Sequence, residues 1–80
     1  MSFVTEMADK LAQDTLKAMD ELGEDRLYMD VAKVLAAAST TLEEAYLTSI
    51  RVRLAERRGR AFLIDFIRAK RAGTAPPQSE

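Results

Sequence analysis

Apolar and small side chains recur every three or four residues through the first quarter of the chain. The positions of this stripe are Val4, Ala8, Leu11, Thr15, Ala18 and Leu22. Such spacing places them on one side of an α-helix and is typical of a coiled-coil seam. Ser2 precedes the stripe as an N-cap residue, and Gly23 follows it where a left-handed residue ends a helix. The pattern therefore predicts a helix over residues 3–22.

A second apolar face follows after a short polar connection. Its members are Leu27, Val31, Val34, Leu35 and Ala38. We predict a helix over residues 26–38 with Asp25 as its N-cap. The connection between the two helices, LGED, is tight, and it therefore predicts an antiparallel helical hairpin.

A third apolar stripe begins after the polar residues at 39–41. It consists of Leu42, Tyr46, Ile50 and Leu54. Thr41 and Glu44 have the separation of a capping box, which predicts that the helix starts at this point. No residue stops the helix before Gly59, and one glycine costs a helix only about 1 kcal/mol relative to alanine. The pattern can continue to Ala72, which predicts a helix of roughly thirty residues.

The length of this third helix decides the architecture. It would measure roughly 45–48 Å, whereas a compact chain of this size is only about 30 Å across. Either the helix bends near Gly59 into a fourth helix, or its projecting end packs on another subunit. We therefore predict an all-α fold, an antiparallel hairpin plus a long C-terminal helix, as a three- or four-helix bundle completed by dimerisation. Residues 1–72 would form one domain, and the small, polar and proline-containing residues 73–80 a disordered tail.

A dense apolar block, FLIDFI, occupies residues 62–67 of the third helix. Its side chains point to nearly all sides of a helix, which is typical of a segment surrounded by protein. Burial within a four-helix chain and burial between subunits both satisfy this pattern. We favour burial between subunits, because the block is long for so small a core. The predicted interface residues are Ile50, Leu54, Phe62, Leu63, Ile64, Phe66 and Ile67.

Charge is distributed unevenly along the chain. Residues 1–50 contain ten acidic and four basic side chains, whereas residues 51–80 contain three acidic and eight basic ones. Five arginines can contact phosphate groups or an acidic protein partner: Arg51, Arg53, Arg57, Arg58 and Arg60. They can equally pair with acidic residues around the first turn of a hairpin, namely Asp20, Glu21, Glu24 and Asp25. We favour such pairing, since no aromatic residue is interleaved with the arginines as a base-stacking platform.

The chain contains neither cysteine nor histidine. Disulfides and thiolate metal sites are thereby excluded, and the commonest general base is missing. Glu21 and Glu24 have the spacing of a magnesium-binding pair, but Gly23 separates them and ends the helix. No P-loop, dinucleotide-binding fingerprint or EF-hand loop is present. We therefore expect a cytoplasmic protein without enzymatic activity or cofactor. We also expect no membrane segment, because the longest uncharged apolar run near the C-terminus is AFLI.

One segment, LYMDVAKVLAAASTTLEEAYLTSI, resembles the first two helices of repressors similar to the lactose and purine regulators. The resemblance rests on Tyr28, Asp30, Val31, Ala32 and Ser39. It implies a helix-turn-helix that reads DNA with its second helix. The segment departs from the pattern because Met29 is inserted before the aspartate, alanines replace the usual turn glycine, and Glu43 and Glu44 occupy the reading positions. We interpret the similarity as helix-capping chemistry, since carboxylates there would face phosphates.

Two functional hypotheses follow from these observations. The first is a small helical interaction or regulatory module that acts through protein–protein contacts as a homodimer. The second is a nucleic-acid-binding regulator that uses the helix-turn-helix-like segment or the arginine-rich helix. The first is favoured, because the chain combines an excess of apolar helix surface with no catalytic constellation.

Overall fold

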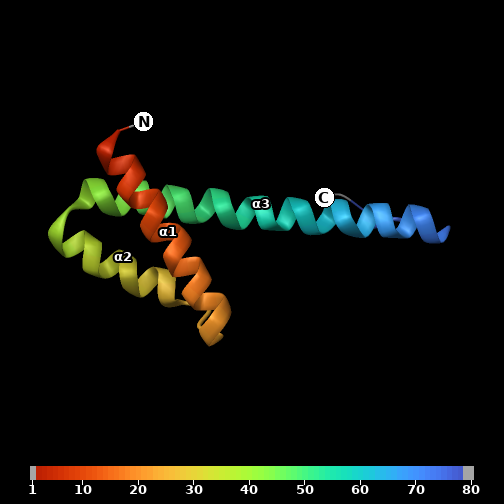
Figure 1. Ribbon diagram of the computed structural model, residues 1–80, viewed down its shortest axis with the longest axis horizontal. Helices are drawn as coiled ribbons and strands as arrows, with labels where there is room; N and C mark the ends of the chain where they lie inside the picture. Colours follow the sequence, from red (N-terminus) through yellow and green to blue (C-terminus); the bar gives the residue numbers. More distant parts are fainter. Residues whose placement is uncertain (1, 79–80) are drawn as a thin grey trace.

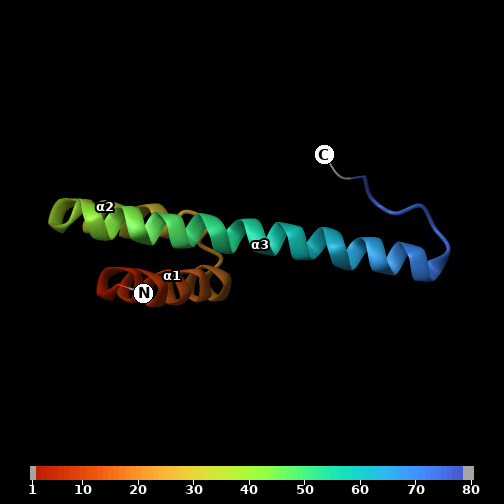
Figure 2. The ribbon, with the colours of Figure 1, turned by 90° about the horizontal axis from the view of Figure 1, so that it is seen from above.

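The computed structural model describes residues 2–78, and these form three α-helices without a β-strand. The helices are α1 (Phe3–Leu22), α2 (Leu27–Ala38) and α3 (Thr40–Ala72). They confirm the predicted all-α fold. In Figure 1, α2 and α3 form a V that opens away from their junction, and α1 crosses them. Figure 2 shows that α1 lies in a layer of its own beside α2 and α3.

Helix α1 has the predicted bounds, and its two ends show why. The Ser2 hydroxyl accepts a hydrogen bond of 3.0 Å from the Thr5 amide, which satisfies one of the free donors of the first turn. Gly23 ends the helix in the left-handed region (φ 69°), and its amide donates to the Met19 carbonyl. A side chain at this φ would be strained, which explains glycine at the position.

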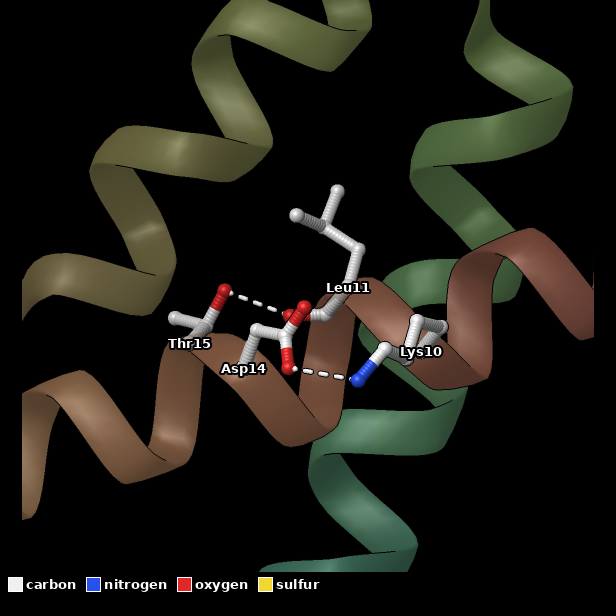
Figure 3. Close-up of polar contacts among 4 residues, drawn as sticks. All are labelled: Lys10, Leu11, Asp14 and Thr15. Carbon is white, nitrogen blue, oxygen red and sulfur yellow. Dashed lines mark hydrogen bonds and ion pairs between the residues drawn. The ribbon is translucent and has the colours of Figure 1, made fainter.

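The two sides of α1 differ as its sequence pattern indicates. Figure 3 shows an exposed ion pair between Lys10 Nζ and Asp14 Oδ1, 3.1 Å apart, on the outer side. Thr15 lies on the inner side, and its hydroxyl donates to the Leu11 carbonyl at 2.8 Å. The buried hydroxyl therefore finds its acceptor within the same helix.

Two predicted helix starts differ from the structure. Helix α2 begins at Leu27 behind Arg26, and no side chain caps it, so the predicted Asp25 cap is wrong. Helix α3 begins at Thr40, and the hydroxyl of Ser39 accepts from the Leu42 amide at 3.2 Å. The predicted Thr41 cap is therefore also wrong. The backbone at Ser39 is extended (φ −160°, ψ 108°), which lets this one residue end α2 and cap α3.

The core is small and lies where the three helices meet. Its buried apolar residues are Ala8, Ala12, Leu16, Ala32, Tyr46 and Ile50. The alanines of α1 leave room for the two large side chains of α3, Tyr46 and Ile50. Two members of the predicted apolar stripes, Leu22 and Val34, are 67% and 71% exposed. Leu22 is the last residue of α1, and Val34 lies about 160° around α2 from the buried Ala32 at 100° per residue, so neither faces the core.

Helix α3 projects far beyond the hairpin (Figure 1). Its 33 residues correspond to about 50 Å, and the molecule measures 53 × 29 × 20 Å. The radius of gyration is 16.3 Å, against about 12 Å for a compact chain of this length. The helix runs through Gly59 without a break, so the bend that would have produced a fourth helix is absent from residues 2–78.

The chain leaves α3 at Gly73, which again adopts a positive φ of 74°. Residues 74–78 form neither helix nor strand. Part of the predicted tail, residues 79–80, lies outside the described residues. Disorder of residues 73–80 stays a prediction.

Candidate interaction surface

The apolar block of α3 lies on the projecting end, which neither α1 nor α2 covers (Figure 1). Four of its side chains are classed as exposed: Phe62 (36%), Leu63 (52%), Ile64 (40%) and Ile67 (38%). The fifth, Phe66, is half-buried. The predicted interface residues of the block are therefore together on one exposed helix end.

Neighbours along the same helix partly cover the two phenylalanines. The ring centroids of Phe62 and Phe66 are 6.3 Å apart, and the rings are tilted by 35°. The Lys70 ammonium lies 5.9 Å from the Phe66 centroid, within the range of a cation–π contact. These contacts do not involve the three exposed aliphatic side chains of the block, Leu63, Ile64 and Ile67.

Two other predicted interface residues are located elsewhere. Ile50 has no exposed surface and belongs to the core of the single chain, unlike the residues of the block. Leu54 is half-buried and packs against the same core. The reason is the length of α3, because its first half fills the hairpin and only its second half projects.

Three of the five predicted arginines are engaged within the chain. Arg57 donates two hydrogen bonds to the Asp20 carboxylate, at 3.2 and 3.0 Å, and thereby ties α3 to the end of α1. Arg60 pairs with Glu56 one turn earlier at 2.6 Å. The guanidinium of Arg53 donates to the Ser49 hydroxyl at 3.1 Å. The two ion pairs, of Arg57 and Arg60, leave the five arginines with less unpaired positive charge than the sequence alone indicates.

The remaining two arginines, Arg51 and Arg58, are exposed. Neither forms an ion pair within residues 2–78. They lie within about 20° of each other on α3 at 100° per residue, and more than 90° away from Arg57 and Arg60. The five arginines therefore do not form one continuous basic face.

A groove runs between α1 and α3 and has a volume of about 880 Å³. Asp9, Gln13 and Leu16 contribute to its wall from α1. Ala45, Val52 and Arg53 contribute from α3. The sequence analysis missed this groove, because it results from the crossing of two helices and has no signature in either one alone.

The groove and the apolar block share one side of α3. Ala45, Val52, Gly59, Leu63 and Phe66 lie within about 60° of each other at 100° per residue. The first two border the groove, and the last two belong to the block. A helix that followed this side of α3 would contact the groove and the block in succession.

The described residues contain no group of acidic side chains that could hold a metal ion. No helix among them is long and apolar enough to cross a membrane. The junction of α2 and α3 is a single residue, Ser39. A helix-turn-helix has a turn of about three or four residues, so this junction differs from the resemblance noted above.

Comparison with protein-family models, with curated proteins and with solved structures finds no match to this chain.

Proposed function

We propose that the protein is a non-enzymatic helical interaction module that acts through protein–protein contacts as a homodimer. The observation that carries this proposal is the exposed apolar block at the end of a projecting helix. Fully burying one Leu, Ile or Phe side chain contributes about 1.5–3 kcal/mol, so covering this cluster supplies a substantial driving force. A second copy is the partner because the chain itself carries the complementary charge, with acidic and basic halves.

The absence of catalytic chemistry in the sequence supports the same proposal. The one deeply buried phenol, Tyr46, donates its hydroxyl proton to the Tyr28 carbonyl at 3.1 Å and is closed off from solvent. It serves the core, and it cannot reach a substrate. A chain without cysteine suits the reducing cytoplasm, which we propose as its location.

The mass in solution tests the proposal. Sedimentation equilibrium at micromolar concentration should give twice the mass of the chain. The double variant Leu63→Ser/Ile67→Ser should give the single-chain mass while its helix content is retained, because both side chains are exposed in one chain. Val34→Ser is the matched control, since Val34 is exposed on α2 outside this surface. A single-chain mass for the unmodified protein would overturn the proposal.

Exposed Arg51 and Arg58 favour one second candidate, a small nucleic-acid-binding protein. Arginine contacts to phosphates give binding that weakens steeply as salt rises. Titration of labelled DNA and RNA at about 50 mM salt distinguishes the candidates, because this function requires salt-sensitive binding there. Arg51→Gln/Arg58→Gln should then reduce the affinity, with Arg53→Gln as the control. No binding at this salt concentration would eliminate the candidate.

A further inference from the structure

The groove and the projecting end of α3 match in length. The α3 residues that border the groove extend from Ala45 to Arg57, which is about 20 Å of helix. The projecting end extends from Arg58 to Ala72, or about 22 Å. Gly59 lies near the boundary between the two stretches. A two-fold axis at Gly59 would place the projecting end of one copy opposite the groove of the other copy.

We propose that two copies pack their α3 helices antiparallel around a two-fold axis at Gly59, with each projecting end lying against the α1–α3 groove of the other copy. This inference rests on the proposed homodimer and specifies how it is built. The contact is isologous, so the same surface serves both copies and the assembly closes at two. It extends along most of α3, and a long contact of this kind suits the roughly 800 Å² per partner that stable interfaces bury.

Side-chain sizes along this face fit the antiparallel arrangement. Leu63 of one copy faces Ala55 of the other, each four residues from the axis. Phe66 faces Val52, each seven residues from the axis, and Val52 is 62% exposed in one chain. Large side chains therefore meet smaller ones, which lets the helices interdigitate.

Gly59 gives a separate argument for a close crossing at the axis. A Cβ atom built at Gly59 meets nothing within 4 Å, so packing inside one chain does not require glycine there. Its φ is that of an ordinary helical residue, and alanine would make the helix more stable. A glycine on the contact side does allow two helix backbones to approach closely.

Charge distinguishes the antiparallel from the parallel arrangement. The projecting stretch, residues 58–72, contains five basic side chains and one acidic one. The hairpin, residues 3–38, contains eight acidic side chains and four basic ones. Antiparallel packing brings each basic end beside the acidic hairpin of the other copy, and places Lys70 opposite Thr48, on the groove wall that also includes Asp9. Parallel packing would put the two basic ends together, where they repel.

Cysteine cross-linking tests this geometry, since the chain has no native thiol. In the antiparallel dimer Ala55 faces Leu63, so the double variant Ala55→Cys/Leu63→Cys should form a disulfide-linked dimer on oxidation. The single variants Ala55→Cys and Leu63→Cys should cross-link at least about tenfold more slowly. Each has its two thiols about 12 Å apart along the helices, beyond the reach of a disulfide, which needs Cα atoms within about 7 Å. Ala61→Cys, on the other side of α3, is the control and should stay unlinked.

The outcomes separate the two proposals. A single-chain mass for the unmodified protein overturns both the homodimer and its geometry. A dimeric mass with single variants that cross-link as fast as the double variant overturns the antiparallel arrangement alone. A dimeric mass with no cross-linking of the double variant also overturns the antiparallel arrangement.

Discussion

At the scale of single residues, Tyr46 combines complete burial with a polar hydroxyl group. Its side chain has no exposed surface, and alanines at positions 8 and 12 of α1 belong to the same buried cluster. Its hydroxyl donates to the Tyr28 carbonyl and so links α3 to α2. Burial raises the pKa of this hydroxyl above its usual 10.0, and a hydrogen bond with Thr15 partly offsets the effect. Tyr46 is therefore held in its neutral form.

Replacement of Tyr46 by phenylalanine should lower the free energy of unfolding by about 1 kcal/mol, the net value of one hydrogen bond. The raised pKa also makes the native state lose stability above pH 10, because the unfolded chain releases its phenol proton first. Chemical denaturation between pH 7 and 11 should therefore show a shallower alkaline loss for Tyr46→Phe than for the unmodified protein. Tyr28→Phe, which keeps the acceptor carbonyl, is the control. Equal slopes for Tyr46→Phe and the unmodified protein would contradict this account.

The Arg57–Asp20 pair joins residues of α3 and α1 through two hydrogen bonds, with both side chains about half exposed. Exposed pairs contribute about 0.2–1 kcal/mol and are screened by salt. A double-mutant cycle with Asp20→Asn and Arg57→Gln should give a coupling energy in this range that shrinks in 1 M salt. The same cycle on Lys10 and Asp14, a pair within α1, is the comparison. A coupling energy that does not change with salt would contradict an exposed pair.

At the scale of helices, periodicity correctly predicted the all-α fold class and the bounds of α1, whereas it left open whether α3 bends near Gly59. It failed where the outcome depends on two helices together. The stripe of α1 included Leu22, which is exposed, and omitted Leu16, which is buried. Coiled-coil spacing applies to a partner helix that runs alongside over the whole length. Helix α1 instead crosses its neighbours at an angle, so only the residues near the crossing are buried. The groove and its position relative to the apolar block depend on this crossing, so no single-helix pattern could predict them.

The start of α3 offers a direct comparison of two candidate caps. Ser39 accepts from the Leu42 amide, and no such bond involves the predicted cap, Thr41. Ser39→Ala should cost about 1 kcal/mol and lower the melting temperature by about 4–8 °C in a domain of this size. Thr41→Ala should change it little. Thermal unfolding followed by circular dichroism measures both, and the reverse order would place the cap at Thr41.

Substitution of Gly59 by alanine should raise the stability of α3 and lower the affinity of the proposed dimer. Gly59→Ala should stabilise α3 by about 1 kcal/mol at concentrations where the chain is single, since glycine is the weaker helix former and the site is open. The same methyl group at the proposed crossing should weaken association. Ala61→Gly, on the other side of α3, should lower helix stability and leave the crossing intact. Analytical ultracentrifugation and thermal unfolding of the two variants give both quantities, and tighter association of Gly59→Ala would contradict a crossing at this residue.

At the scale of the whole molecule, the chain divides into a packed hairpin region and a bare helix end. The buried apolar residues of the described chain, residues 2–78, all precede Leu54, so the last third of α3 gains almost nothing from the core. Isolated helices of about 15 residues are marginal in water, and α3 beyond Arg57 has this length. In the proposed dimer, the second copy would supply the packing that the projecting end lacks within one chain.

The proposed dimer predicts a melting temperature that rises with protein concentration. Association that occurs only in the folded state stabilises it by mass action, so each tenfold increase in concentration should raise the midpoint measurably. Leu63→Ser/Ile67→Ser should remove this dependence, because it takes away two of the exposed aliphatic side chains and leaves the core intact. Val34→Ser should keep the dependence, since its site faces solvent on α2. Differential scanning calorimetry from about 10 μM to 1 mM covers the range in which such dimers form. A midpoint that stays constant across that range, with a single-chain mass, would contradict self-association through the end of α3.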